Sequence, residues 1–505
     1  MLQPNQQTDL QVLYYLSKRK YSVQKLATLL AITPRKLRQR VASINEILSV
    51  TEHLTDVLNI SESGIIRLNP QLKARGLLVF YHFKLDLLKR DYEFRILSML
   101  TTRERTTPAQ LCQALFISKS YLYRLIKTVN ANLLSLNIHI KITNNAVSLE
   151  GDEIMVRILA FMMNTDAFQS LEWPYVGFSE QDVMTSLPSE LDTPLAHMSV
   201  TKRTFLSHLF AIIATRLNGG HRIHLRGDAH LRELLELIIS NYDVTHNFNP
   251  SHFKDAPADE VYAERLYLNL LSRIYLSDFY SEANKIALGK TFRNSDIYFT
   301  NLARNLTDSL TANLHLKFSE KVEDVLTYFI TIGLAYYHLL GGQTGKLNDY
   351  IFMIKDNRAA APSPKTEEIA AVLHDFIHDN HLSILASADA EFIATNFITT
   401  VLAITVTPKV NVYLQSVRDY TAYTLLATMI RRVFNEENVE ITTDIAQADL
   451  IITDSFEAGC PQADVYFFDD LQQHWPGILQ AINDRILKKL FDVPKESTLL
   501  KPITA

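Results

Sequence analysis

The chain has 505 residues, of which 47% are hydrophobic and 21% charged, and it contains only two cysteines. These values are ordinary for a globular protein of several domains, and two cysteines exclude a disulfide framework or a zinc site built from cysteines. The net charge of −5 hides an asymmetry, because residues 1–151 hold 21 Lys and Arg against 10 Asp and Glu, whereas the rest holds 29 against 45. A basic end on an acidic body indicates a nucleic-acid-binding end.

A pattern that occurs twice, 85 residues apart, predicts two helix-turn-helix motifs in this basic part. The copies are residues 26–41 and 111–126. In each, an apolar helix face is followed by a three-residue break that ends in a hydroxyl residue, Thr33 or Ser118, which can cap a second helix. Two helices joined in this way can place the second one in the major groove of double-stranded DNA.

Each copy is expected to lie in a module of three helices followed by a wing. We expect helices over residues 9–20, 23–30 and 34–48 in the first module, and over 92–100, 108–115 and 119–134 in the second. The first wing is expected over residues 61–68. The second should pair residues 138–142 with 147–150 through a turn at Asn144-Asn145.

The second helix of each copy is expected to bury one face and to offer the other to DNA. Helical spacing assigns the buried face to Leu37, Val41, Ile44 and Leu48 in the first copy, and to Leu122, Leu125, Ile126 and Val129 in the second. The opposite face carries Arg35, Lys36, Arg38, Gln39 and Arg40 in the first copy, and Lys119, Ser120, Tyr123, Arg124 and Lys127 in the second. Arg and Gln can read base edges, whereas Lys and Ser mostly contact phosphate.

From about residue 165 the chain becomes acidic and helical, with a second internal repeat. Residues 205–220 and 329–342 both read as an apolar helix that ends in a Gly pair, and the pairs are 122 residues apart. Glycine just past a helix supplies the left-handed cap conformation. Because helical patterns follow each copy, we expect two related helical bundles.

The last part of the chain alternates strands and helices. Strands are expected over residues 409–414, 439–442, 448–453 and 464–468, with helices over 419–435 and 476–490, which is typical of a small parallel α/β domain. The predicted fold is therefore mainly α. Its five parts are two winged helix-turn-helix domains (1–75 and 76–160), two helical bundles (161–290 and 291–405) and the α/β domain (406–505).

No motif indicates catalysis, a cofactor or a metal ion, and we expect a protein that is not an enzyme. His, Asp and Glu nowhere have the spacing of a metal site, and nucleotide loops and serine nucleophile elbows are absent. Residues 341–346 resemble a nucleotide loop but lack its Lys-Ser/Thr ending and the preceding strand. The polar stretch from Met1 to Asp9 and the shortness of the apolar run 397–406 predict a cytoplasmic protein without a membrane partner.

This order of parts resembles the Mga/AtxA-like transcription regulators of Gram-positive bacteria, which carry phosphotransferase-system regulation domains. The likeness extends over essentially the whole chain and is strongest in the second helix-turn-helix and its wing. The C-terminal part is similar in topology to a phosphotransferase enzyme IIB. The resemblance implies a DNA-binding regulator whose regulation domains are phosphorylated on histidines by phosphotransferase-system phosphocarrier proteins. It also implies a homodimer that forms through the C-terminal domain, from about residue 408.

Two histidines become candidate phosphorylation sites through this resemblance. The family pattern of Leu, His and a later Arg is matched by Leu206, His208 and Arg216, with the Arg about one position late. In the second repeat Ile330 stands opposite His208, and His338 aligns with Arg216. A phosphoryl group on His208 is expected to meet Arg216 and the basic loop with His221, Arg222 and Arg226. On His338 it is expected to meet mostly apolar neighbours with Tyr336 and Tyr337, so the two sites should act with opposite signs.

Two further family positions depart from a working phosphocarrier. Asn396 stands where the motif 392–396 should end in a phosphorylatable His, and Gln415-Ser416 replaces the Cys that should follow the first strand of the C-terminal domain. Cys460 lies elsewhere. We therefore interpret this domain as an inactive copy kept for contact. A phosphotransferase-system phosphocarrier or enzyme is a less favoured alternative for the whole chain. An RNA-binding antiterminator is also less favoured, because such proteins use a small RNA-binding module of β type.

Overall fold

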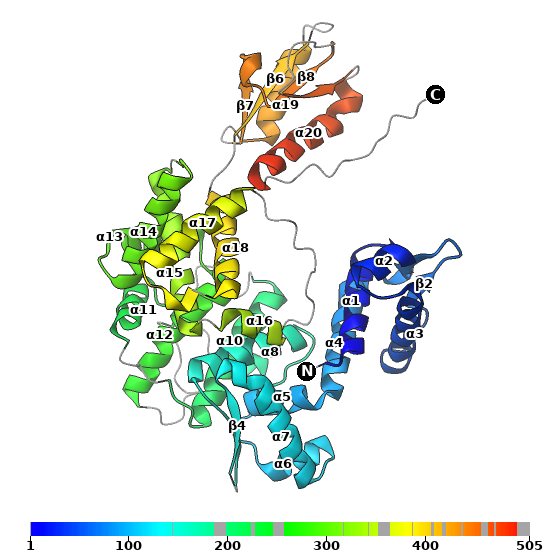
Figure 1. Ribbon diagram of the computed structural model, residues 1–505, viewed down its shortest axis with the longest axis vertical. Coiled ribbons are helices and arrows are strands. Elements are labelled where there is room, and N and C mark those ends of the chain that lie inside the picture. Colours follow the sequence, from blue (N-terminus) through cyan, green and yellow to red (C-terminus); the bar gives the residue numbers. More distant parts are fainter. Residues whose placement is uncertain are drawn as a thin grey trace. The chain divides into compact units, whose positions relative to one another are not determined.

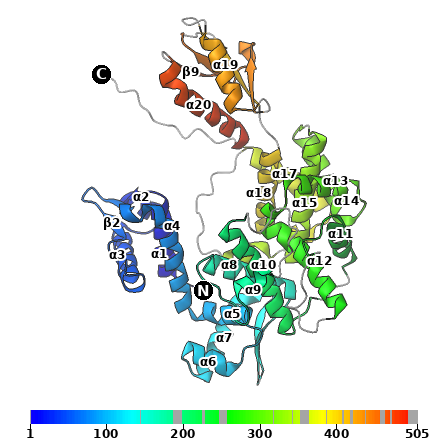
Figure 2. The ribbon, with the colours of Figure 1, turned by 180° about the vertical axis from the view of Figure 1, so that it is seen from behind.

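The computed structural model describes most of the chain. The described residues are 2–143, 145–185, 198–223, 228–245, 257–316, 318–341, 343–351, 364–385, 387–405, 409–416, 421–435, 438–455, 463–468 and 471–491. They are mainly helical, with a small parallel sheet near the C-terminal end, which confirms the predicted fold class (Figures 1 and 2). The chain divides into two compact units, Met1–Ala303 with Thr331–Arg358, and Arg304–Ile330 with Ala359–Ala505.

The first helix-turn-helix module opens the first unit. It contains α1 (Pro4–Lys18), β1 (Tyr21–Ser22), α2 (Val23–Leu29), α3 (Pro34–Thr51), β2 (Leu58–Ile60) and β3 (Ile65–Leu68). The helix α1 begins earlier than expected, because Pro4 suits a first turn and the Gln6 side chain accepts a hydrogen bond of 2.9 Å from the Gln3 N–H. The wing is a three-stranded antiparallel sheet in the order β1-β3-β2, and not one strand after a turn.

The second module follows a helix that the sequence did not predict. After η1 (Pro70–Arg75), that helix, α4 (Gly76–Arg90), packs against α1, α5 and α8. The module contains α5 (Tyr92–Thr102), α6 (Pro108–Leu115), α7 (Lys119–Leu133), η2 (Leu134–Leu136), β4 (His139–Ile142) and β5 (Val147–Glu150). The last two strands form the predicted antiparallel wing. Asn144, one of the two predicted turn residues, lies outside the described residues.

The rest of the first unit is helical. It contains α8 (Glu153–Phe168), α9 (Glu180–Thr185), α10 (Val200–Asn218), α11 (Ala229–Asn241), α12 (Ala258–Tyr275), η5 (Ser277–Phe279), α13 (Glu282–Asn294) and α16 (Thr344–Ile351). The division between the units falls within α14 (Tyr298–Asn313) and α15 (Glu320–Leu340). The Gly-ended helices are confirmed, because α10 stops before Gly219 and α15 stops before Gly341, whose φ of 53° is left-handed.

The second unit ends in the predicted α/β fold. Its elements after α15 are α17 (Pro364–Asp379), η6 (Ser383–Leu385), α18 (Ala388–Thr405), β6 (Val410–Gln415), α19 (Ala422–Val433), β7 (Val439–Thr442), η7 (Ile445–Gln447), β8 (Leu450–Thr453), β9 (Asp464–Phe467) and α20 (Leu471–Phe491). The four strands are parallel in the order β7-β6-β8-β9. The apolar core joins Val412 and Ile452 of the sheet to Leu426 of α19 and Ile482 of α20. No described helix is both long and apolar enough to cross a membrane.

Candidate DNA interface and regulatory site

Both helix-turn-helix motifs make the same turn. Shortly after the first helix of each motif, Ala31 and Phe116 have left-handed φ values of 51° and 55°, and these two positions are 85 residues apart. The hydroxyl of Thr33 then accepts a hydrogen bond of 3.2 Å from the Lys36 N–H, and Ser118 does the same for Tyr121 at 3.3 Å. The predicted caps are therefore confirmed, and the repeat in sequence is a repeat in backbone geometry.

The buried faces of the two recognition helices agree with the helical spacing at all but one position. All four residues expected to be buried in α3 are buried, and so are Leu122, Ile126 and Val129 of α7. Leu125 is only half-buried. Leu133, the counterpart of Leu48, is fully buried and completes the core face of α7 instead.

The faces expected to meet DNA are exposed, with one exception. In α3, Arg35, Lys36, Arg38 and Gln39 are exposed, and in α7 all five candidates are exposed, namely Lys119, Ser120, Tyr123, Arg124 and Lys127. Arg40 is half-buried instead, with its guanidinium 3.4 Å from the carboxylate of Asp9 on α1. Burial raises the pKa of Asp9 to about 6, although Arg40 opposes this shift. Arg40 is thus drawn toward the core of the module.

An asparagine on each recognition helix, not predicted from the sequence, fixes the strand that follows that helix. Asn45 accepts a hydrogen bond of 2.8 Å from the Leu58 N–H and donates one of 2.8 Å to the Leu58 carbonyl. Asn130 makes the same two contacts with Ile140, at 2.6 and 3.0 Å. The two asparagines are themselves 85 residues apart, which is the signal that the sequence offered.

The second module is joined closely to the helical region of the first unit. Gly219 approaches the Glu104 carbonyl so closely that a Cβ on it would lie 2.5 Å away. The Asn218 side chain donates a hydrogen bond of 3.0 Å to the Glu104 carboxylate, and the Val176 N–H donates one of 3.0 Å to the Thr102 carbonyl. These contacts make the second module continuous with α10 and the segment before α9.

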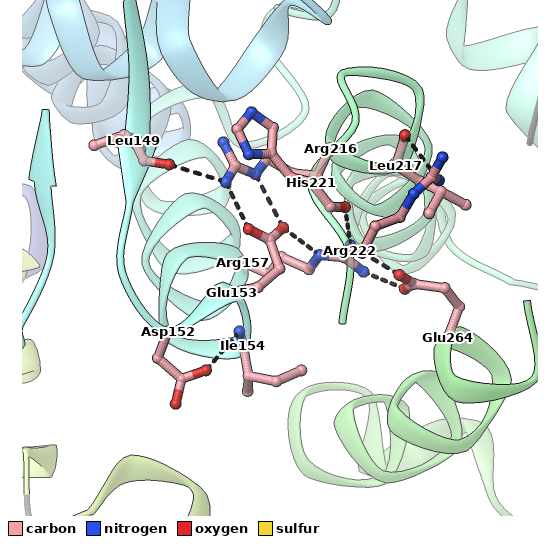
Figure 3. A network of polar contacts seen from close by, with 10 residues as sticks. All are labelled: Leu149, Asp152, Glu153, Ile154, Arg157, Arg216, Leu217, His221, Arg222 and Glu264. Atoms are coloured by element: carbon pink, nitrogen blue, oxygen red, sulfur yellow. Dashed lines mark hydrogen bonds and ion pairs between the residues drawn. The ribbon is translucent and has the colours of Figure 1, made fainter. Parts of the chain in front are cut away.

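A buried network of charges lies where the second wing meets α8 (Figure 3). Glu153, at the start of α8, lies 2.8 Å from the guanidinium of Arg157 and 2.6 Å from that of Arg216 on α10. Arg157 also pairs with Glu264 of α12, and Arg216 donates a hydrogen bond of 3.1 Å to the Leu149 carbonyl in β5. Two guanidiniums and two carboxylates therefore neutralise one another, and the network binds the wing strand to α8, α10 and α12.

The electrostatics of Glu153 follow from this arrangement. Burial raises the pKa of its carboxyl, but the charges and hydrogen bonds of Arg157 and Arg216 outweigh burial, so that the pKa lies below its usual value. Glu153 is therefore held in its charged form at neutral pH.

The expected surroundings of His208 are wrong. It is fully buried on α10, its Nδ1 lies 3.0 Å from the hydroxyl of Tyr175, and the rings of Trp173 and Tyr175 lie 5.4 Å from its own. Arg216 is turned to Glu153 and Leu149, and Arg226 lies outside the described residues. Because burial lowers the pKa of His208 to about 4, the ring is neutral near pH 7.

His338 has the opposite character, and only part of its surroundings is apolar: the Phe299 ring lies 5.3 Å from its own, but a carboxylate also contacts it. Its side chain is 33% exposed, and its Nε2 lies 2.5 Å from the carboxylate of Asp228 at the start of α11. It opens on a cavity of about 180 Å³, which Arg222 and the turn Gly151–Ile154 also line. Tyr336 instead contacts Tyr275, hydroxyl to hydroxyl, at 2.9 Å.

The structure also describes two positions at which this chain departs from the family pattern, Asn396 and Ser416. Asn396 is exposed on α18 and donates its amide to the Phe392 carbonyl at 3.0 Å. After β6, the Ser416 hydroxyl donates a hydrogen bond of 2.7 Å to Asp454, so that a hydroxyl stands where a thiol was expected. Cys460 lies outside the described residues. Among the residues that the structure describes, no group of three His, Cys, Asp or Glu could hold a metal ion.

Comparison with known proteins places the second module in a family. Residues 80–163 match the model of the Mga helix-turn-helix domain, a range that begins in α4, contains α5 to β5 and ends in α8. A "Putative trans-acting regulator" of Streptococcus pneumoniae serotype 4 is 22% identical over 235 residues, 46% of this chain and 45% of that protein. The match thus covers less than half the length of this relative. Both findings confirm the resemblance to Mga-like regulators.

Proposed function

We propose that this chain, which carries an Mga helix-turn-helix domain, is a transcription regulator that binds double-stranded DNA through both of its helix-turn-helix modules. The second module supports this most directly, because it lies within the family match and all five candidate residues of its recognition helix are exposed. The excess of Lys and Arg in residues 1–151 supplies the charge that phosphate binding requires.

The second module should contribute more affinity than the first. Arg40 in the first module is held toward Asp9, whereas Arg124 and Lys127 in the second are exposed on α7. We therefore expect the pair Arg124→Ala and Lys127→Ala to weaken binding of the full chain to upstream DNA of its own genome more than the pair Arg38→Ala and Arg40→Ala. A mobility-shift titration measures both. Equal losses, or no binding by the unaltered chain, would contradict the proposal.

The same proposal includes control by phosphotransferase-system phosphocarrier proteins, with His338 as the acceptor. A donor protein must reach the histidine ring, and His338 is partly exposed at a cavity whereas His208 is enclosed by aromatic rings. Asp228 holds one ring nitrogen of His338, which orients the ring.

A phosphoryl group on His338 would act on the turn that joins the second wing to α8. It adds close to two negative charges beside Asp228 and the carboxylates of the turn Gly151–Ile154, with Arg222 as the nearby cation. Repulsion would displace the turn, and Glu153 would carry the displacement through Arg216 to Leu149 in the wing. This favours a loosened state, through repulsion between like charges.

Labelled phosphoenolpyruvate and the general carrier proteins test this part. We expect acid-labile label on the full chain that His338→Ala removes and His208→Ala leaves in place. Label that persists in His338→Ala would show that another residue is the acceptor.

Dimerisation through the C-terminal domain completes the proposal. Val465 and Phe467 lie two residues apart on the edge strand β9 and are each 50% exposed, so this strand offers apolar side chains that a second copy could cover. Light scattering on the full chain measures its mass directly. A monomer at micromolar concentration would contradict dimerisation.

A further inference from the structure

We propose that Asn130 is a positioning residue for DNA binding, which holds Lys141 of the second wing at a fixed place relative to the recognition helix α7. This inference rests on the proposed DNA-binding function and adds to it a wing contact and the residue that aligns it. Neither Asn130 nor Lys141 is among the candidate residues on the recognition helices.

The geometry of the wing gives Asn130 this role. In the part of the chain that the structure describes, the wing is a two-stranded ribbon of β4 and β5, and Ile140 pairs with Leu149 on one side. On the other side, the Asn130 amide satisfies both the N–H and the carbonyl of Ile140, as a third strand would. A two-stranded ribbon is marginally stable alone, so these two hydrogen bonds fix its place against α7.

The clamp determines where the charged side chains of β4 point. The Ile140 side chain is 3% exposed, so that it anchors one face of the strand in the core. Side chains alternate along a strand, and the neighbours His139 and Lys141 are accordingly exposed on the other face. Lys141 is thus presented to solvent from a strand held to the same helix that carries Arg124 and Lys127.

The first module repeats the arrangement in a different sheet. Asn45 clamps Leu58, whose side chain is buried, and the next residue, Asn59, pairs with the exposed Arg67 of β3. The clamped residue lies 13 positions after the asparagine in the first module and 10 in the second. The two modules differ in the length of the connection from helix to strand and in the number of strands in the wing. Both nevertheless have the two hydrogen bonds from the asparagine, which are therefore a shared feature.

A double-mutant cycle separates positioning from a purely structural role. The variants are Asn130→Ala, Lys141→Ala and both together in the full chain, and the readouts are the DNA dissociation constant and its dependence on salt. Lys141→Ala should lower the salt slope by about 0.9, the loss of one phosphate contact, and weaken binding several-fold. Asn130→Ala should do nearly the same, and the double variant should be no weaker than either single one.

The controls distinguish the possible failures. Asn132→Ala changes an amide on the same helix that contacts Glu93 and not the wing, and it should leave the salt slope unchanged. If Asn130→Ala fails to fold, Asn130→Asp replaces it in the cycle. This variant keeps the acceptor for the Ile140 N–H, and we expect it to fold and to have an intermediate salt slope. Additive losses in the cycle, or an unchanged slope in Lys141→Ala, would overturn the inference. Absence of DNA binding by the unaltered chain would instead remove the proposed function and the inference with it.

Discussion

Replacing Arg216 by Met should destabilise the first unit and do so in a pH-dependent way. Methionine has an unbranched side chain of similar length but no guanidinium. The change therefore removes two hydrogen bonds to Glu153, of 3.0 and 2.6 Å, and one of 3.1 Å to the Leu149 carbonyl. Removing one partner of a buried ion pair costs about 3–5 kcal/mol. Because Arg157 still lies 2.8 Å from Glu153, we expect the lower end of that range, about 3 kcal/mol.

The sign of the pH dependence follows from the Glu153 carboxyl. Its pKa in the folded chain lies below the usual value of 4.5, so its contribution to stability is present above that pH and is lost as the pH falls through the folded pKa. In Arg216→Met the folded pKa rises. The difference in unfolding free energy between the two proteins should therefore be larger at pH 7 than near pH 4.5.

Tryptophan fluorescence can report this locally. In a Trp475→Phe background, Trp173 beside His208 becomes the remaining tryptophan, and its emission during urea unfolding follows the helical region that contains Arg216. Arg222→Met is the matched control, because Arg222 and Glu260 are partly exposed and their pair should be worth less than about 1 kcal/mol. A loss below about 1 kcal/mol for Arg216→Met, or an equal loss at both pH values, would refute the reasoning.

Three further outcomes are expected. The pKa of His208 is lowered to about 4 in the folded chain, so the unfolding free energy should fall as the pH drops from 6.5 toward 4. His208→Gln should make this fall smaller when unfolding midpoints are compared at pH 7 and pH 5. An unchanged fall would mean that His208 is not the titrating group. At His338, Asp and Ala substitutions should move promoter-reporter output in opposite directions, since one mimics and the other prevents phosphorylation, and identical output in both would refute a regulatory role. A chain that ends at residue 408 should be monomeric by light scattering, whereas a persistent dimer would move the interface to the helical region.

The elements that the sequence predicted well are those with local signals. The helices α6 and α7 begin where expected because Thr107 and Ser118 cap them, and the apolar spacing sets the buried face. The helix α4 was not predicted, because its start lacks a side-chain cap, although Phe80 and Phe83 are buried in it. Local sequence signals therefore predict where helices begin, whereas the packing between modules depends on tertiary contacts that these signals do not reveal.

The site was harder to predict because its contacts join distant parts of the chain. Asp228 lies 110 residues before His338, and nothing in the sequence pairs them. The expected position of Arg216 near His208 assumed that residues on one helix share surroundings, yet Arg216 is drawn to Glu153 and His208 to Tyr175. The Asn45 and Asn130 clamps could have been found, since the 85-residue repeat aligns them.

The salt dependence of DNA binding tests the central claim most directly. The dissociation constant of the full chain for upstream DNA of its own genome should be measured by fluorescence anisotropy over a series of salt concentrations, for the unaltered chain and for the Arg124→Ala, Lys127→Ala double variant. We expect a steep slope for the unaltered chain and a slope shallower by about 1.8 for the variant, one phosphate contact for each charge removed. A flat slope, or the same slope in both proteins, would contradict DNA binding through the second recognition helix.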